Sequence, residues 1–323
     1  MGDYLNIYCE FGFLQKFIDS SPKFELGKTN NNHKYWYKYL DLFCGNSNML
    51  LIDIEKDLFV KQCNDENMQG QMLSLLLNTH ADGIGCLECL PQESKNMDIS
   101  INDDMGEDYF RRHEHTVFLL DKNKELCKEM EEDYGLIFIS SENIYDYSKL
   151  LFIPDIQEIN EHSILWTCIS NYIHPCNTIV LIDGYITNET DDIIDKNLNS
   201  IFNTLLPTKL NKSCFNIYIF TQDDYDSEKN KNKKILIENV ICSLREYQIN
   251  VNTIFEHKLE HDRHLFTNYC LFSSGYGFVL KESQRKIGTH LTFFPICSTY
   301  SGKNNAFQIV QNLKKKKFGT SAE

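Results

Sequence analysis

The stretch from His261 to Gly275 holds the residues whose types and spacing are best suited to chemistry. One residue separates His261 from Arg263, and side chains at that spacing point to the same face of a strand. A histidine can attack a phosphodiester phosphorus or move a proton, and the planar guanidinium of an arginine can hold two phosphate oxygens at once. The pair therefore suits phosphate binding and turnover. A buried ion pair between Arg263 and Glu256 or Glu260 would suit the same face equally well.

Asn268 and Gly275 follow this pair at a spacing that matches a known signature. Four residues separate Arg263 from Asn268, and six separate Asn268 from Gly275. The pattern resembles that of the phospholipase D-like superfamily, in which His-x-Lys, four residues and Asp are followed, after six more, by a Gly-Ser or Gly-Gly turn. The His-Asp-Arg order is closer still to the phospholipase D-like domains attached to MIT modules and to bacterial relatives. The resemblance covers about residues 177–282.

The resemblance implies a site that cleaves phosphodiesters through a covalent phosphohistidine, with no metal or other cofactor. His261 matches the nucleophile, Arg263 the cation that holds the phosphate, and Asn268 the aspartate that orients a histidine. The substrate-binding turn is matched by Ser274, Gly275 and Gly277. Because the chain carries one copy of the motif, the resemblance also implies a homodimer that brings two His261 side chains together.

Two residue types depart from the family's pattern. Arg263 replaces a lysine, and its fork can still hold phosphate because it donates two parallel hydrogen bonds. Asn268 replaces an aspartate, and a neutral amide can orient a histidine without supplying the charge that stabilises an imidazolium. Three interpretations remain open: a working phosphodiesterase, a phosphate-binding site without catalysis, and a motif with a structural role alone.

The second half of the chain alternates strands and helices in a way that would position this motif. Hydrophobic patterning predicts strands at 178–183, 215–221 and 250–256, helices at 163–173, 191–206 and 233–247, and two further short strands at 264–267 and 269–272. We therefore expect residues 177–282 to form one sheet with helices on both faces, with antiparallel strands added to a parallel core.

The first half also alternates strands and helices, but less regularly. Continuous apolar runs predict strands at 5–9, 49–54, 116–120 and 136–140, with helices at 12–19, 68–78 and 124–132 and a long polar excursion at 81–112. We expect a Rossmann-like parallel sheet here, and a domain boundary near Pro154. The predicted architecture is α/β, with an acidic Rossmann-like domain over residues 1–154 and a phospholipase D-like domain over residues 155–323.

Carboxylates stand at three predicted strand ends of the first half. Glu10 follows one strand, Asp53 lies near the end of the next, and Asp121 follows a third. Because α/β folds place ligands at the carboxyl ends of parallel strands, these acids could hold Mg²⁺ for nucleic-acid hydrolysis. The arrangement loosely resembles PIN-like nucleases. Acidic residues are abundant in this half, so chance placement is the alternative.

Other motifs are weaker. Cys86-x-x-Cys89 with His113-x-His115 would supply a zinc site's ligand types, but the two patterns can equally be unrelated. Neither a P-loop nor a dinucleotide-binding glycine pattern occurs, so the sequence gives no support for nucleotide-driven chemistry.

The charge of the chain is unevenly divided. The net charge is -14; residues 1–150 carry 14 Lys and Arg against 27 Asp and Glu, a balance of -13, and residues 151–323 carry 18 against 19, a balance of -1. Basic clusters at Lys229 to Lys234 and Lys314 to Lys317 would follow a phosphate backbone if they share a face. Otherwise they are a solvated loop and a frayed tail.

Composition sets the remaining expectations. With 42% hydrophobic and 24% charged residues among 323, the chain is globular, and no apolar run is long enough for a membrane span. Twelve cysteines without a signal peptide indicate reduced thiols and a cytoplasmic protein. We expect the protein to bind nucleic-acid phosphodiesters and, if it is an enzyme, to cleave them. It would then be a nuclease or a nuclease-associated subunit, and the resemblance connects such proteins with bacterial antiviral defence. The alternative is a noncatalytic adaptor that recognises phosphate, a lipid headgroup or a partner protein.

Overall fold

The computed structural model describes most of the chain. The described residues are 5–22, 31–45, 47–81, 86–96, 109–110, 113, 115–159, 166–187, 190–258, 263–275, 278, 289–297 and 306–319. His261 and Gly277, both assigned to the site above, lie outside them. The chain divides into two compact units: unit 1 comprises residues 1–131, 136–148 and 299–323, and unit 2 comprises residues 132–135 and 149–298. Compared with the boundary expected at Pro154, unit 2 begins earlier, and the last residues belong to unit 1.

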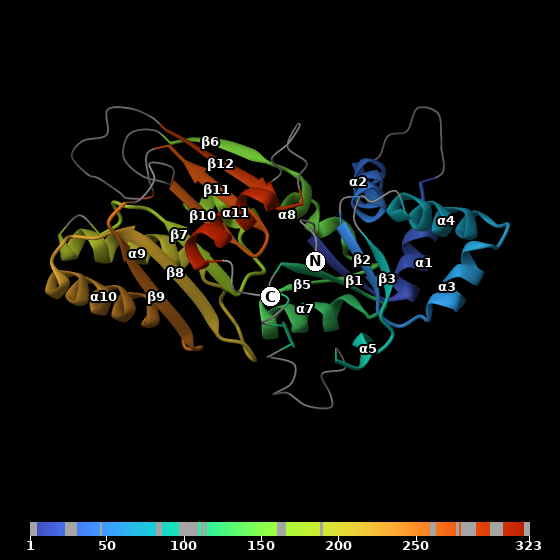
Figure 1. Ribbon diagram of the computed structural model, residues 1–323, viewed down its shortest axis with the longest axis horizontal. Coiled ribbons are helices and arrows are strands. Elements are labelled where there is room, and N and C mark those ends of the chain that lie inside the picture. The colour runs from blue at the N-terminus through green and yellow to red at the C-terminus, as the bar shows by residue number, and fades with distance from the viewer. Residues whose placement is uncertain are drawn as a thin grey trace. The chain divides into compact units, whose positions relative to one another are not determined.

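Unit 1 is built on a parallel five-stranded sheet with the order β3-β2-β1-β4-β5 (Figure 1). Every residue of β2, β4 and β5 is buried, which explains why most of their residues are apolar and why apolar and polar residues do not alternate along them. The strands are β1 (Leu5–Cys9), β2 (Ser47–Leu51), β3 (Leu87–Cys89), β4 (Thr116–Leu120) and β5 (Ile137–Ser140). The predicted Rossmann-like sheet is confirmed.

The chain crosses this sheet in two directions. It moves from β1 through β2 to β3 on one side and from β4 to β5 on the other. Parallel crossovers are right-handed, so this reversal places helices on both faces and makes the carboxyl ends of β1 and β4 a topological switch point. The helices of unit 1 are α1 (Phe11–Asp19), α2 (Asn31–Gly45), α3 (Lys56–Cys63), α4 (Met68–Ala81), α5 (Glu93–Asn96), α7 (Lys124–Tyr134), the 3₁₀ helix η1 (Ile144–Tyr147) and α11 (Ala306–Phe318).

Unit 2 contains a separate mixed sheet of seven strands with the order β6-β12-β11-β10-β7-β8-β9. Its strands are β6 (Asp155–Ile159), β7 (Thr178–Ile182), β8 (Phe215–Gln222), β9 (Ile249–Glu256), β10 (Arg263–Thr267), β11 (Cys270–Ser274) and β12 (Thr289–Pro295). β7, β8 and β9 are parallel, and the other four pair antiparallel. The expected parallel core with antiparallel additions is therefore present, although β6 and β12 were not predicted.

The helices of unit 2 differ from the prediction in two ways. They are α8 (Ser148–Phe152), the 3₁₀ helix η2 (Trp166–Tyr172), α9 (Asp191–Leu205) and α10 (Ser227–Cys242). The sequence predicted helices on both faces of residues 177–282, but α9 and α10 lie side by side, since two right-handed crossovers that advance in the same direction use the same face (Figure 1). The predicted helix at 163–173 is, where described, the short 3₁₀ helix η2, a segment rich in residues that favour α-helix only weakly and closely followed by Pro175.

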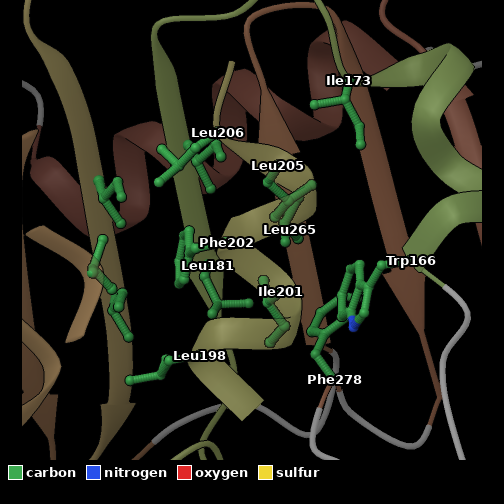
Figure 2. Close-up of a cluster of buried hydrophobic side chains, with 14 of the residues drawn as sticks. Trp166, Ile173, Leu181, Leu198, Ile201, Phe202, Leu205, Leu206, Leu265 and Phe278 are labelled. Carbon is green, nitrogen blue, oxygen red and sulfur yellow. The ribbon is translucent and has the colours of Figure 1, made fainter. Parts of the chain in front are cut away.

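The core of unit 2 lies between its sheet and α9. Figure 2 shows Leu198, Ile201, Phe202 and Leu205 of α9 gathered near Leu181 of β7. All five side chains are fully buried. The spacing of the four α9 residues is that of one helix face, which fixes the helix against the sheet and holds the ends of β7 and β10 in place.

The two lysine clusters both lie in helices, not in a loop and a tail. Asp226 caps α10 by accepting hydrogen bonds from the N–H groups of Glu228 and Lys229, so the helix begins before the first lysine cluster. The second cluster lies in the last turn of α11. Burial lowers the pKa of Lys314 to about 7, which leaves this lysine only partly charged at neutral pH.

Within the described residues, no helix is long and apolar enough to cross a membrane.

Candidate functional site

Three polar side chains form one row across the sheet of unit 2, where its parallel strands end. Arg263, the first residue of β10, pairs with Ser274 of β11. His264 pairs with Ile182 of β7, so the next position outward sets Arg263 beside Asp183. Because side chains alternate along each strand, Asp183, Arg263 and Ser274 share the face that α9 covers.

Arg263 is held from three sides. Its Nε lies 3.8 Å from Oδ1 of Asp183, and its Nη1 donates a 2.8 Å hydrogen bond to the carbonyl oxygen of Gly275. The guanidinium also lies 4.9 Å from the centre of the Tyr185 ring, a cation–π arrangement. Its Nη2 makes no hydrogen bond to any residue that the structure describes. The cation is thus fixed in place with donors still directed elsewhere.

Asp183 is the anchor of this arrangement. Its side chain is fully buried, Oδ1 accepts a 2.9 Å hydrogen bond from the N–H of Tyr185, and Oδ2 accepts a 2.7 Å hydrogen bond from the N–H of Phe278. A buried carboxylate needs such donors and a cation to offset its lost hydration. The ion pair that Arg263 forms is with Asp183, whereas the sequence suggested Glu256 or Glu260 as its partner.

The arrangement favours binding an anion over generating a nucleophile. A guanidinium whose position is fixed by a carboxylate and a carbonyl can donate charge-assisted hydrogen bonds to phosphate without reorganising. Ser274 pairs with Arg263 on the neighbouring strand, and Gly275 follows it. Whether His261 joins them lies outside the described residues.

Asn268 is at the other end of β10. It lies five positions after Arg263, or about 17 Å along the strand at roughly 3.4 Å per residue. It is fully buried; Oδ1 accepts hydrogen bonds from the N–H groups of Asn177 at 2.9 Å and Thr178 at 3.1 Å, and Nδ2 donates to Oδ1 of Asn177 at 2.9 Å. The structure therefore does not bring Asn268 to Arg263; it uses the amide to tie the β10–β11 turn to the start of β7.

The three acids of unit 1 meet at one edge of its sheet. β2, β1 and β4 are neighbours, and their carboxyl ends lead to Asp53, Glu10 and Asp121. The N–H of Asp121 donates a 2.5 Å hydrogen bond to Oε2 of Glu10, and the N–H of Phe11 donates a 2.7 Å hydrogen bond to Oδ1 of Asp53. This edge includes the topological switch point between β1 and β4, the usual ligand position of such sheets.

Two lysines lie among these acids. Lys16 forms an ion pair with Asp121, and Nζ of Lys122 lies 3.6 Å from Oε1 of Glu10. We call Glu10, Asp53, Asp121, Lys16 and Lys122 the acid–lysine cluster. Burial raises the pKa of Glu10, with a smaller contribution from Asp53, against the opposing hydrogen bond from Asp121 and the charge of Lys122. Among the described residues, no group of three or more His, Cys, Asp or Glu side chains is placed to hold a metal ion.

Glu10→Gln is expected to become more stable relative to the wild type as the pH rises from about 4 to 7. The pKa of Glu10 is higher in the folded protein than in the unfolded chain, so the wild type loses stability as the pH rises through the window between the two values. Glutamine does not titrate, and its amide oxygen can still accept the hydrogen bond from Asp121. Urea unfolding of both proteins at the two pH values measures the difference.

The control for this experiment is Glu125→Gln, the same change at an exposed position of α7. A pH-independent effect of Glu10→Gln would contradict the prediction. Adding Mg²⁺ tests the alternative site in the same assay: a midpoint that rises for the wild type but not for Glu10→Gln would show that the acid–lysine cluster binds the metal.

The proposed cysteine and histidine ligands are not assembled. Nε2 of His113 lies 2.9 Å from the Tyr8 hydroxyl, and Nδ1 lies 2.5 Å from the carbonyl oxygen of Tyr109. Both ring nitrogens are thus engaged with the protein. Burial also raises the pKa of the Cys86 and Cys89 thiols, which disfavours the thiolates that bind zinc.

Neither a family model nor a curated protein matches this chain.

Sequence reasoning missed two residues of the unit 2 site and two of the acid–lysine cluster, Lys16 and Lys122. Asp183 ends a buried apolar run, a position where a carboxylate in an α/β fold is a functional signal, and Tyr185 follows it. Lys16 lies in the last turn of α1. Its contact with Asp121 could be predicted only from the order of the strands together with the position of the helix.

Proposed function

We propose that unit 2 is a phospholipase D-like domain that binds the phosphodiester backbone of nucleic acid through Arg263. One observation carries the proposal. Arg263 and Gly275, twelve residues apart and matched to two separate parts of the family's signature, are joined by a 2.8 Å hydrogen bond. They stand at the carboxyl end of β7, beyond which ligands of α/β sheets bind. The parallel β7-β8-β9 core followed by antiparallel strands adds support.

Binding is favoured over turnover by the contacts of Asn268. The residue that replaces the family's aspartate is engaged with Asn177 and Thr178, far from Arg263 along the strand. Hydrolysis through His261 is the second candidate, supported by the spacing of the motif. Hydrolysis would require a homodimer and no metal. Under this second candidate the protein is a cytoplasmic nuclease, or a nuclease-associated subunit, that acts in antiviral defence.

Arg263→Lys is expected to weaken binding of a labelled single-stranded oligonucleotide about ten-fold. Lysine keeps the positive charge beside Asp183, so the buried carboxylate keeps a counter-ion, but the fork that holds two phosphate oxygens is lost. Because the charge is retained, the slope of log affinity against log salt should stay the same. Fluorescence anisotropy over a range of salt concentrations measures both quantities.

The matched control is Arg245→Lys, which loses the same fork in the same unit. Arg245 donates to the carbonyl oxygens of Asn203, Leu206 and Pro207 at the end of α9, so its loss should affect stability and not affinity. Equal affinity of the wild type and Arg263→Lys would overturn the proposal. A wild type that binds vesicles with anionic headgroups, or a partner protein, but no oligonucleotide would favour the adaptor class.

His261→Ala separates binding from cleavage. In a hydrolase this substitution should abolish turnover and leave affinity nearly unchanged, because a nucleophile contributes mainly in the transition state. Turnover that resists both His261→Ala and EDTA would contradict hydrolysis at this motif. In a binding domain no turnover is seen for the wild type, and only affinity changes.

A further inference from the structure

The loop between β8 and α10 holds an exposed tyrosine in a conformation that tyrosine rarely adopts. Tyr225 has φ of 57°, in the left-handed region, and is 76% exposed. Such a backbone costs about 1 kcal/mol or more for a residue with a Cβ. No burial of the ring compensates for this, so the strain points to a function of the loop rather than to packing.

The loop is nevertheless rigidly held. Oδ1 of Asp223 accepts hydrogen bonds from the N–H of Tyr225 at 2.8 Å and from Nδ2 of Asn230 at 2.5 Å, and its own N–H donates to the carbonyl oxygen of Glu256 at 3.0 Å. These hydrogen bonds, together with the nearby His257, lower the pKa of Asp223. The tyrosine is therefore displayed on a fixed support at the carboxyl ends of β8 and β9.

The ring of Tyr225 is stacked on that of His257. Their centroids are 5.2 Å apart with an interplanar angle of 17°, and Nδ1 of His257 lies 2.8 Å from Oδ2 of Asp223. The His257 side chain is 70% exposed. Because the two solvated rings are stacked on each other and held by one carboxylate, each presents its outer face, the kind of surface on which an unpaired base stacks.

Charged side chains of both signs surround this pair. Each acid of the loop has a local partner: Asp223 pairs with His257, Asp224 lies 3.1 Å from Nζ of Lys233, and Asp226 caps α10. The exposed residues Lys229 and Lys231 follow in the first turns of α10, at the end where the helix dipole is positive. Asp226 keeps its charge at the helix N-terminus and the exposed Glu228 lies in the same turn, so Lys229 and Lys231 offset these acids and can also approach a phosphate.

The pair also lies on the same sheet edge as Arg263. β9, β8, β7 and β10 are consecutive neighbours, so three strand spacings, about 14 Å in all, separate the strand of His257 from that of Arg263. Both stand beyond the carboxyl ends of the parallel strands. A single strand of several nucleotides can span this distance with a phosphate at one end and a base at the other.

We propose that Tyr225 and His257 form a base-stacking platform for single-stranded nucleic acid whose backbone reaches Arg263. The proposal rests on the function proposed above and narrows its substrate to single strands, because bases in a duplex are already stacked and cannot lie on an external ring. Stacking tolerates any base, so the platform confers a preference for single strands and little preference for sequence.

Tyr225→Asn tests the platform by removing the ring while keeping a residue that tolerates positive φ. We expect its affinity for a labelled oligothymidylate to fall about 5- to 150-fold, with a melting temperature equal to or above that of the wild type. Tyr225→Phe, which keeps the ring, should bind like the wild type. An abasic oligonucleotide of the same length has the phosphates but no bases, so its affinity should be the same for all three proteins.

The outcomes separate this proposal from the one on which it depends. Tyr37→Ala, which removes another exposed tyrosine, is the control and should leave affinity unchanged. The stacking proposal is wrong if Arg263→Lys weakens binding but Tyr225→Asn does not. It is also wrong if Tyr225→Asn weakens binding of the abasic oligonucleotide and of the oligothymidylate equally. In both cases the proposal that Arg263 binds phosphate stands. If the wild type binds no oligonucleotide, or only vesicles with anionic headgroups, both proposals fail.

Discussion

Asp183→Ala is expected to lower the free energy of unfolding by about 3 to 5 kcal/mol. The substitution removes a fully buried carboxylate and leaves the N–H groups of Tyr185 and Phe278 without the acceptor that they use. It also strips the mostly buried guanidinium of Arg263, 14% exposed, of its counter-ion. Breaking one side of a buried pair costs far more than the pair contributes, because the remaining charge stays desolvated.

The measurement is urea unfolding followed by the fluorescence of Trp166, read in a Trp36→Phe background so that the signal comes from unit 2. Asp191→Ala is the matched control, since it removes an exposed carboxylate from the first turn of α9 and should cost less than about 1 kcal/mol. Equal losses for the two variants would contradict the role given to Asp183. The double variant with Arg263→Ala should lose less than the sum of the single losses.

Asn268→Ala is expected to cost about 3 to 5 kcal/mol, and Asn268→Asp about 1 to 3 kcal/mol. Alanine leaves the N–H groups of Asn177 and Thr178 unpaired in the core. Aspartate can still accept from both, but it sets an oxygen against Oδ1 of Asn177, whose own Nδ2 is held by the carbonyl oxygen of Tyr134. Restoring the residue of the family's signature should thus destabilise the protein.

The same unfolding assay ranks these variants. Asn252→Ala, an exposed position on β9, is the control and should change stability by less than about 0.5 kcal/mol. A gain of phosphodiesterase turnover in Asn268→Asp, or stability equal to that of the wild type, would show that the position serves chemistry and that its contacts with β7 are dispensable.

The sequence predicted the elements whose signal is local. β1 and β4 have the predicted bounds because strands buried on both faces are uninterrupted apolar runs. β6 was missed because its residues, Asp-Ile-Gln-Glu-Ile, are mostly polar and form the edge of the sheet. The start of α10 was missed because lysines and asparagines carry no helical periodicity, whereas the Asp226 cap fixes it.

The site was predictable in part for the same reason. The spacing from Arg263 to Gly275 is a local property, and the structure brings these two residues together. The partner of Arg263 depends on which strand pairs with β10. Because β7 lies about eighty residues away in sequence, the sequence suggested the nearby acids Glu256 and Glu260 instead. The position of Asn268 depends on strand length, which places it beyond reach of the cation.

The path of the chain through the two units bears on how the protein is made. Unit 2 is complete once residue 298 has been added, whereas unit 1 still lacks α11, whose Ala306, Phe307 and Val310 are buried. A nascent chain emerging from the ribosome can therefore finish the seven-stranded unit while the five-stranded unit waits for its last helix. The face that carries Arg263 would exist before unit 1 has its last helix, and early termination of translation would damage unit 1 first.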